Sequence, residues 1–236
     1  MKDLFNIFYF KTVTSTMDVI KNYAPNTVII ADEQTRGRGK QNRKWFSENS
    51  NNLYMSLSIE ANDSRIDYSN YSFLTAIAMV KTLENLANRP IGLETKWPND
   101  LLVNGKKTGG ILLEMDSSRG LLVIGLGLNI DRHPEKLESM AFSPTDLSTE
   151  GYSFRKQDII DKFLEQFRSY STILHTHGFR PIGDEWIRYA YNFKRKITVK
   201  TNSLNTTGIF EDLAQDGSLV LSTERGRIIV RSADIF

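Results

Sequence analysis

The sequence predicts an α+β protein, in which a mixed, largely antiparallel sheet packed with helices is followed by a small β-barrel. Three observations support this fold class. Apolar residues recur at helical spacing over 71–88. Asn104-Gly105, a pair typical of two-residue hairpin turns, separates two apolar runs. After Asn192 the chain changes to short alternating stretches with turn signals. We therefore expect a larger domain over residues 1–192 and a small barrel domain over 193–236.

The elements can be justified in chain order. A β-branched and aromatic strand is expected over 5–13, and the hydroxyls of residues 14–16 can cap a short helix ending near Pro25. Six further runs are predicted to be extended, namely 27–32, 53–60, 91–96, 101–103, 106–114 and 121–129. Helical spacing predicts one helix over 71–88, one over 155–175 and a shorter one around Trp186. In the tail, turns are expected at 215–217 and 224–226.

Composition excludes several classes of function. The chain has 236 residues, enough to bury a substantial core, and a mild net charge of +2 that does not imply whole-molecule nucleic-acid binding. It has no cysteine, so disulfides, thiolate metal sites and a cysteine nucleophile are excluded. It shows neither a signal peptide at its start nor an apolar run of about 18 residues. We therefore expect a cytoplasmic protein that does not enter a membrane.

Three polar clusters stand beside strand-like runs. The nine residues from Gly37 to Trp45 form a basic loop with four cations and two glycines. Its backbone can approach a ligand closely while its basic side chains face an anion. Lys96-Trp97-Pro98-Asn99-Asp100 and Lys107-Thr108-Gly109-Gly110 follow. Together the clusters predict one site for a phosphate-bearing small molecule.

These residues also carry a resemblance to a known family. Four strings, in matching order and spacing, resemble biotin–protein ligase, and they are Gln34-Thr35-Arg36-Gly37-Arg38-Gly39-Lys40, Lys96-Trp97-Pro98-Asn99-Asp100, Lys107-Thr108-Gly109-Gly110-Ile111-Leu112-Leu113-Glu114 and Gly125-Leu126-Gly127-Leu128-Asn129. The resemblance implies a class II synthetase-like catalytic domain and an SH3-like C-terminal barrel. The chain resembles the monofunctional type without an N-terminal DNA-binding domain, so we expect no specific nucleic-acid partner.

The reaction implied by the resemblance has two steps. Biotin and ATP, with Mg²⁺, form biotinyl-5′-AMP and pyrophosphate; a lysine of a biotin carboxyl-carrier domain then takes the biotinyl group, and AMP leaves. Cations are needed because two anions must be brought together. A homodimer formed along a sheet edge is also compatible with the resemblance, and the sequence leaves this open.

Residue roles are carried over position by position. Arg38 and Lys107 would face the carboxylate and the α-phosphate, and Asp100 would orient or deprotonate the incoming lysine, so these three are the candidate catalytic residues. The candidate biotin-binding residues are Ser15, Thr16, Gln34, Gly37, Arg38, Lys107 and Gly110. The candidate nucleotide-binding residues are Lys40, Arg43, Trp45, Lys96 and Asn129. The protein ligands of Mg²⁺ are unknown. Lys40 stands where the family usually has arginine, and Met17 where asparagine is common.

Two other functions compete with this interpretation. A lipoate–protein ligase or octanoyl transferase of the same superfamily would share the scaffold and the activating lysine. The polar set Ser15, Thr16 and Gln34 favours biotin, whose ureido ring needs hydrogen bonds that a linear acyl chain cannot use. A non-enzymatic nucleic-acid-binding protein would use the basic loop and the barrel, but the mild net charge argues against it. Taken alone, the basic loop is most simply a solvated surface, and Trp45 a packing residue.

Overall fold

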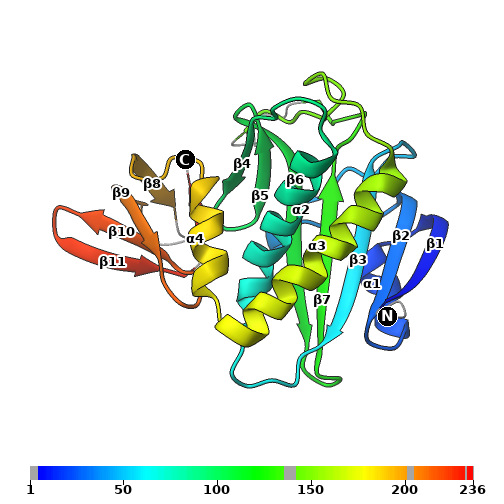
Figure 1. The fold of residues 1–236 in the computed structure, drawn as a ribbon, viewed down its shortest axis with the longest axis horizontal. Helices are drawn as coiled ribbons and strands as arrows, with labels where there is room; N and C mark the ends of the chain where they lie inside the picture. The colour runs from blue at the N-terminus through cyan, green and yellow to red at the C-terminus, as the bar shows by residue number, and fades with distance from the viewer. Residues whose placement is uncertain (1–4, 136–141, 201–204, 232, 236) are drawn as a thin grey trace.

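A computed structural model describes residues 5–135, 142–200, 205–231 and 233–235. A seven-stranded sheet carries two long helices on one face, and a second sheet of five strands lies beside it (Figure 1). The first sheet is built from β1 (Asn6–Val13), β2 (Thr27–Gln34), β3 (Leu53–Glu60), β4 (Leu93–Lys96), β5 (Asp100–Val103), β6 (Lys106–Asp116) and β7 (Leu121–Leu128). The second contains β8 (Lys196–Lys200), β9 (Asn205–Leu213), β10 (Leu219–Thr223), β11 (Gly226–Val230) and β12 (Asp234–Ile235).

The order of the first sheet is β1-β2-β3-β7-β6-β5-β4. Only β1 and β2 pair in parallel, and the other neighbours are antiparallel. The prediction of a mixed, largely antiparallel sheet is therefore confirmed. The hairpin between β5 and β6 turns at Asn104 (φ 50°) and Gly105 (φ 73°), the two positive φ values that its type I′ signature predicts.

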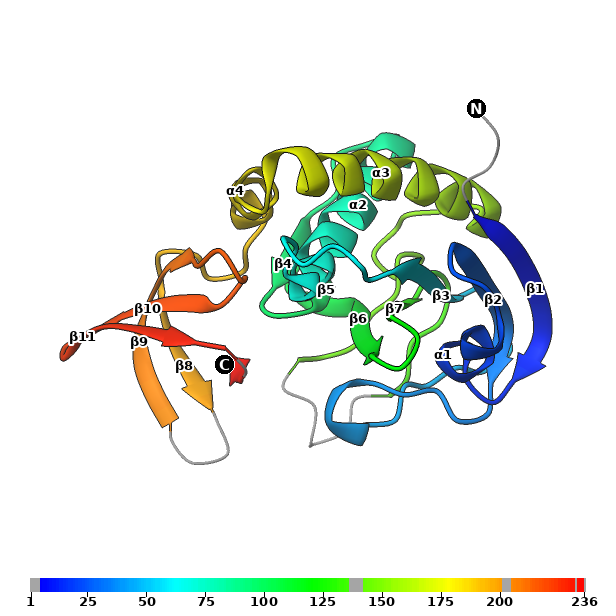
Figure 2. The same cartoon turned by 90° about the horizontal axis from the view of Figure 1, so that it is seen from below.

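The helices are α1 (Thr16–Val19), α2 (Tyr71–Leu86), α3 (Lys156–His177) and α4 (Arg180–Arg188), and three short 3₁₀ turns are η1 (Ile20–Asn22), η2 (Lys40–Asn42) and η3 (Tyr68–Asn70). α2 is buried almost all round because it lies between the sheet and α3, whose apolar stripe includes Phe163 and Phe167. Figure 2 shows α2 and α3 on one side of the first sheet and α1 with the basic loop on the other. The core thus fills one face and leaves the opposite face for a site.

The C-terminal strands pair antiparallel throughout, in the order β11-β10-β9-β8-β12. Their β9–β10 turn packs on the first sheet: Trp97 Nε1 donates to Gly217 O (2.9 Å), and a Cβ built on Gly217 would lie 2.3 Å from the Phe73 ring. A glycine is therefore needed there both for its positive φ of 75° and for the close approach. An SH3-like barrel and a domain boundary at residue 192 stay predictions.

One detail of the predicted start of α1 is wrong. The helical segment after β1 exists, as α1 followed by η1, but Ser15 at its N-cap makes no side-chain capping hydrogen bond. Ser15 is buried (1% exposed) and lines the cavity described next. β2 also continues two residues beyond the expected end, to Gln34.

Candidate active site

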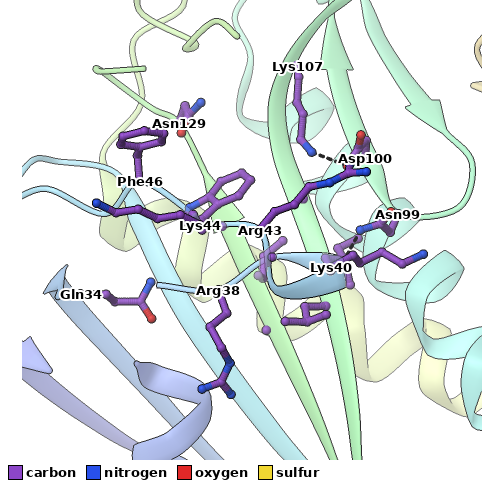
Figure 3. A pocket seen from close by; sticks show the side chains of 18 of the residues that line it. Gln34, Arg38, Lys40, Arg43, Lys44, Phe46, Asn99, Asp100, Lys107 and Asn129 are labelled. Carbon is purple, nitrogen blue, oxygen red and sulfur yellow. Dashed lines mark hydrogen bonds and ion pairs between the residues drawn. The ribbon is translucent and has the colours of Figure 1, made fainter. Parts of the chain in front are cut away.

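A cavity of about 590 Å³ opens on the face of the first sheet opposite α2 and α3. It lies among the β1–α1 junction, the basic loop and strands β5, β6 and β7, and several of its side chains are drawn in Figure 3. All but one of the candidate residues line it, and they are Ser15, Thr16, Gln34, Arg38, Lys40, Arg43, Trp45, Lys96, Asp100, Lys107, Gly110 and Asn129. Segments separated by more than a hundred residues in the sequence therefore meet at one place.

The exception is Gly37, at the start of the basic loop. A Cβ at this position would come 2.6 Å from both Ser47 Oγ and Trp45 O. The predicted contact of Gly37 with biotin is untested. Its visible function is to let the chain turn tightly beside Gln34, which lines the cavity.

A buried hydrogen-bond network forms one end of the cavity. Gln34 Oε1 accepts from Thr16 N (2.9 Å) and Thr16 Oγ1 (3.1 Å), and Gln34 Nε2 donates to Ser47 Oγ (2.8 Å). Ser56 Oγ donates to Thr16 Oγ1 (2.8 Å). Because these contacts fix the amide and the hydroxyl, this end presents oriented polar groups to a ligand.

An apolar wall adjoins this polar end. Met17 is buried (4% exposed) and lies against Gly125, where a Cβ would come 2.6 Å from the Met17 sulfur. The thioether therefore occupies the space that the missing side chain leaves. Met17 therefore makes this wall apolar, whereas an asparagine at position 17 would have offered hydrogen bonds.

The floor of the cavity is a pair of glycines. Gly110 on β6 and Gly127 on β7 are opposite one another in the ladder, and the indole of Trp45 lies on both. A Cβ would come 3.2 Å from the indole at Gly110 and 2.5 Å at Gly127. The buried Trp45 Nε1 has no hydrogen-bond partner among the residues that the structure describes. Such a donor is costly unless a ligand atom accepts from it.

The basic loop is itself a small hairpin. Trp45 N donates to Gly37 O (3.0 Å) and Gly39 N to Arg43 O (2.7 Å), and η2 forms its tip. Gln41 at the tip has a positive φ of 55°. The loop therefore has an internal backbone structure that carries Lys40 and Arg43 to the cavity.

Lys107 and Asp100 form the ion pair at the other end of the cavity. Lys107 Nζ lies 2.6 Å from Asp100 Oδ1, and Lys96 Nζ lies 4.0 Å from Asp100 Oδ2 (Figure 3). Lys96 is buried (6% exposed) with its ammonium 4.3 Å from the centre of the Phe142 ring. Two lysines thus converge on one carboxylate, which places excess positive charge where an anionic ligand can bind.

Arg38 points the other way. In Figure 3 its guanidinium is directed away from the Lys107–Asp100 pair. Its Nη1 donates to Asp18 (2.6 and 2.7 Å) and its Nη2 to Glu114 (2.9 Å). The hydrogen bond to Asp18 raises the pKa of Arg38, and partial burial opposes this. Burial works to raise the pKa of Glu114, but hydrogen bonds from Lys21 and Arg38 outweigh it and hold that pKa below its usual range.

Asn129 holds the backbone beside the cavity. Its Nδ2 donates to Thr145 O (3.0 Å), and its N donates to Thr108 O (2.7 Å). The residue is buried (4% exposed). The amide therefore fixes the segment around Thr145, which in turn donates its N to Lys107 O (2.8 Å).

The cavity is also lined by side chains that the residue-by-residue assignment did not include, among them Lys44, Phe46, Asn99 and Phe142. The first three belong to strings or neighbours already recognised, so their place in the sequence was a usable signal. Phe142 belongs to no recognised string, and nothing in the sequence marked it. No group of three or more His, Cys, Asp or Glu side chains able to hold a metal ion occurs within the described residues. Among these residues, too, no helix is long and apolar enough to cross a bilayer.

Comparison with known proteins identifies the family. Residues 8–131 match the Biotin/lipoate A/B protein ligase family, which is more than half of the chain. The chain is also 33% identical to the bifunctional ligase/repressor BirA of Bacillus spizizenii, over 98% of this chain and 73% of that protein. The chain belongs to the biotin/lipoate A/B protein ligase family.

Further members of the family are similar over most of the chain. A biotin–[acetyl-CoA-carboxylase] ligase from Paracoccus denitrificans is 29% identical over 88% of this chain and 89% of its own length. Among solved structures, the biotin protein ligase from Aquifex aeolicus in complex with biotin and ATP superposes with a TM-score of 0.85. It covers 98% of this chain and 97% of that chain at 23% identity, so this likeness concerns the fold.

Proposed function

We propose that this protein is an ATP-dependent biotin–protein ligase. It activates biotin as biotinyl-5′-AMP and then transfers the biotinyl group to a lysine of a biotin carboxyl-carrier domain. The observation that carries the proposal is the convergence of residues from four separate strings on one cavity. A relative named as a biotin–[acetyl-CoA-carboxylase] ligase, 29% identical to this chain, supports the same activity.

The polar end of the cavity suits the ureido ring of biotin. Thr16 and Gln34 hold each other in a fixed arrangement of donors and acceptors. A ureido group can use both kinds of hydrogen bond, whereas a linear acyl chain has no donor or acceptor to offer these groups. The network therefore favours biotin over lipoate or octanoate.

The cationic end suits the first reaction. A carboxylate oxygen of biotin attacks the α-phosphorus of ATP; the new O–P bond forms as the bond to the pyrophosphate oxygen breaks, and pyrophosphate leaves. Lys107 lies where it can offset the charge of both reactants, with Lys96, Lys40 and Arg43 around the nucleotide. Holding the two reacting atoms together supplies further acceleration.

The second reaction uses the carboxylate of Asp100. The amine of the acceptor lysine attacks the biotinyl carbonyl, a C–N bond forms, and the bond from that carbon to the AMP oxygen breaks. The proton lost by the amine goes to Asp100, whose Oδ1 faces Lys107. The basic loop covers the adenylate in the meantime and keeps water from it.

Mg²⁺ would arrive with the triphosphate. The described residues offer no cluster that could hold it alone, and Mg²⁺ is commonly held by substrate phosphates with one or two carboxylates. A homodimer, an SH3-like C-terminal barrel and the cytoplasm as compartment complete the proposal.

Transfer to an acceptor tests the whole function. Purified protein, ATP, Mg²⁺ and biotin should attach biotin to a purified biotin carboxyl-carrier domain, detected by streptavidin binding. A carrier domain with its acceptor lysine changed to arginine is the matched control and should stay unmodified. Modification of a lipoyl domain with lipoate, and none of the biotin acceptor, would contradict the proposal.

A further inference from the structure

The side chain of Arg38 points out of the basic loop, and carboxylates from two other elements bind its guanidinium. Asp18 belongs to α1 and Glu114 to β6, and they lie 20 and 76 positions from Arg38 in the sequence. The second oxygen of Glu114 accepts from Lys21 Nζ at 2.7 Å. Two cations and two carboxylates thus form a continuous, charge-balanced chain of ion pairs behind the cavity wall that Arg38 lines.

The network fixes the plane of the guanidinium. One carboxylate binds Nη1 through both oxygens and another binds Nη2, so rotation about the side-chain bonds is restrained from two directions. A lysine at this position could not be held in this way. The basic loop's other backbone ties run within its own hairpin, so the Arg38 contacts connect the loop to the helix and the sheet beside the cavity.

These pairs are weak candidates for a purely stabilising role. The side chains are 30% exposed at Arg38, 44% at Asp18 and 29% at Glu114. Exposed ion pairs typically contribute about 0–1 kcal/mol to folding. The network nevertheless holds a residue of the loop that, in the proposed function, covers the acyl-adenylate, which points to a role in placing that loop.

We propose that Asp18 and Glu114 are positioning residues for Arg38, holding its guanidinium in one orientation at the cavity wall and holding the basic loop closed over the acyl-adenylate. This inference rests on the proposed function. Losing either carboxylate removes one of the two anchors of the Arg38 guanidinium, while the indole of Trp45 still lies on the sheet. The adenylate then escapes faster, while the chemistry at Lys107 remains available.

The experiment measures release of biotinyl-adenylate preformed on the protein with labelled biotin. Glu114→Gln and Asp18→Asn should each accelerate release about tenfold, the effect of losing one charge-assisted hydrogen bond. Asp116→Asn is the matched control: it lies on the same strand, contacts Ser118 and should release adenylate as the wild type does. Melting temperatures of all variants report any loss of stability separately.

A double-mutant cycle identifies the route of the effect. If the carboxylates act through Arg38, Glu114→Gln should add nothing in an Arg38→Ala background. Wild-type release rates in both single variants, or an undiminished effect of Glu114→Gln without Arg38, would overturn the inference alone. If the wild type forms no adenylate from biotin and ATP, the proposed function fails and this inference with it.

Discussion

Lys107 Nζ and Asp100 Oδ1 lie 2.6 Å apart across the β5–β6 hairpin. Asp100 pairs with Gly110 and Leu102 with Lys107, with an irregularity in the register between Leu101 and Leu102. This irregularity and the two-residue turn at Asn104-Gly105 bring the two charged side chains to the same end of the cavity. The proposed function assigns these two residues to different steps of the reaction. Because they form an ion pair, replacing one of them changes the electrostatic surroundings of the other.

Removing the lysine should stop activation. We expect Lys107→Ala to lower biotin-dependent adenylate formation by about 10²–10³-fold, as for loss of a preorganised group that stabilises transition-state charge. The measurement is adenylate formed in a single turnover. Lys106→Ala is the matched control, because that ammonium points to Glu150 (3.0 Å) and should leave activity near wild type. Similar losses in both variants would argue against a specific role for Lys107.

Removing the carboxylate should act mainly on the second step. Asp100→Ala deprives the acceptor amine of its base, so transfer from preformed biotinyl-adenylate should fall by about 10²-fold or more. Adenylate formation should fall less, because Lys107 and Lys96 keep their charges. Both steps are measured on the same preparation. An equal loss in both would remove the special role of Asp100 and leave it as a partner of Lys107.

The indole of Trp45 should report ligand binding. It lies on Gly110 and Gly127, and its N–H lacks an acceptor within the described part of the chain, so a ligand on this floor must change its surroundings. With 5-fluorotryptophan incorporated, the ¹⁹F signal of Trp45 should move on addition of biotin. The signals of Trp97 and Trp186, which are 2% and 1% exposed, serve as internal controls and should stay. A Trp45 signal that is unchanged at saturating biotin, assigned with Trp45→Phe, would place the ligand elsewhere.

The carboxylate of Glu150, which contacts the β5–β6 turn, should make the free energy of unfolding depend on pH. Hydrogen bonds from Asn104, and further from Thr145 and Lys106, outweigh burial and lower the pKa of Glu150 to about 2. A depressed pKa contributes stability that is present above the ordinary value of 4.5 and is lost as pH falls through about 2.

We therefore expect Glu150→Gln to lower the melting temperature by about 2–4 °C at pH 7, the effect of about 1 kcal/mol in a protein of this size. The difference from wild type should shrink between pH 4.5 and 2. Glu165→Gln is the control, since Glu165 is 64% exposed in an i,i+3 pair. A difference that persists unchanged at pH 2 would contradict the assigned role of Glu150.

Much of the fold was predictable because local patterns agreed with the final structure. β3 begins and ends where its apolar run does, and Asn104-Gly105 adopts the turn that its residues favour. The candidate site residues also came from local strings. The partners of those residues were not predictable, since contacts such as Arg38 with Glu114 join positions 76 apart and leave no periodic signal. The missing cap at Ser15 was not predictable either, because serine is a residue type that favours the N-cap.

The central claim is that this cavity joins biotin to ATP, and pyrophosphate exchange tests it most directly. Protein, ATP, Mg²⁺ and labelled pyrophosphate should give labelled ATP when biotin is present, and none when biotin is omitted or when Lys107→Ala replaces the wild type. Lipoate in place of biotin should support no exchange. Exchange with lipoate but not with biotin, or no exchange with either, would contradict the account.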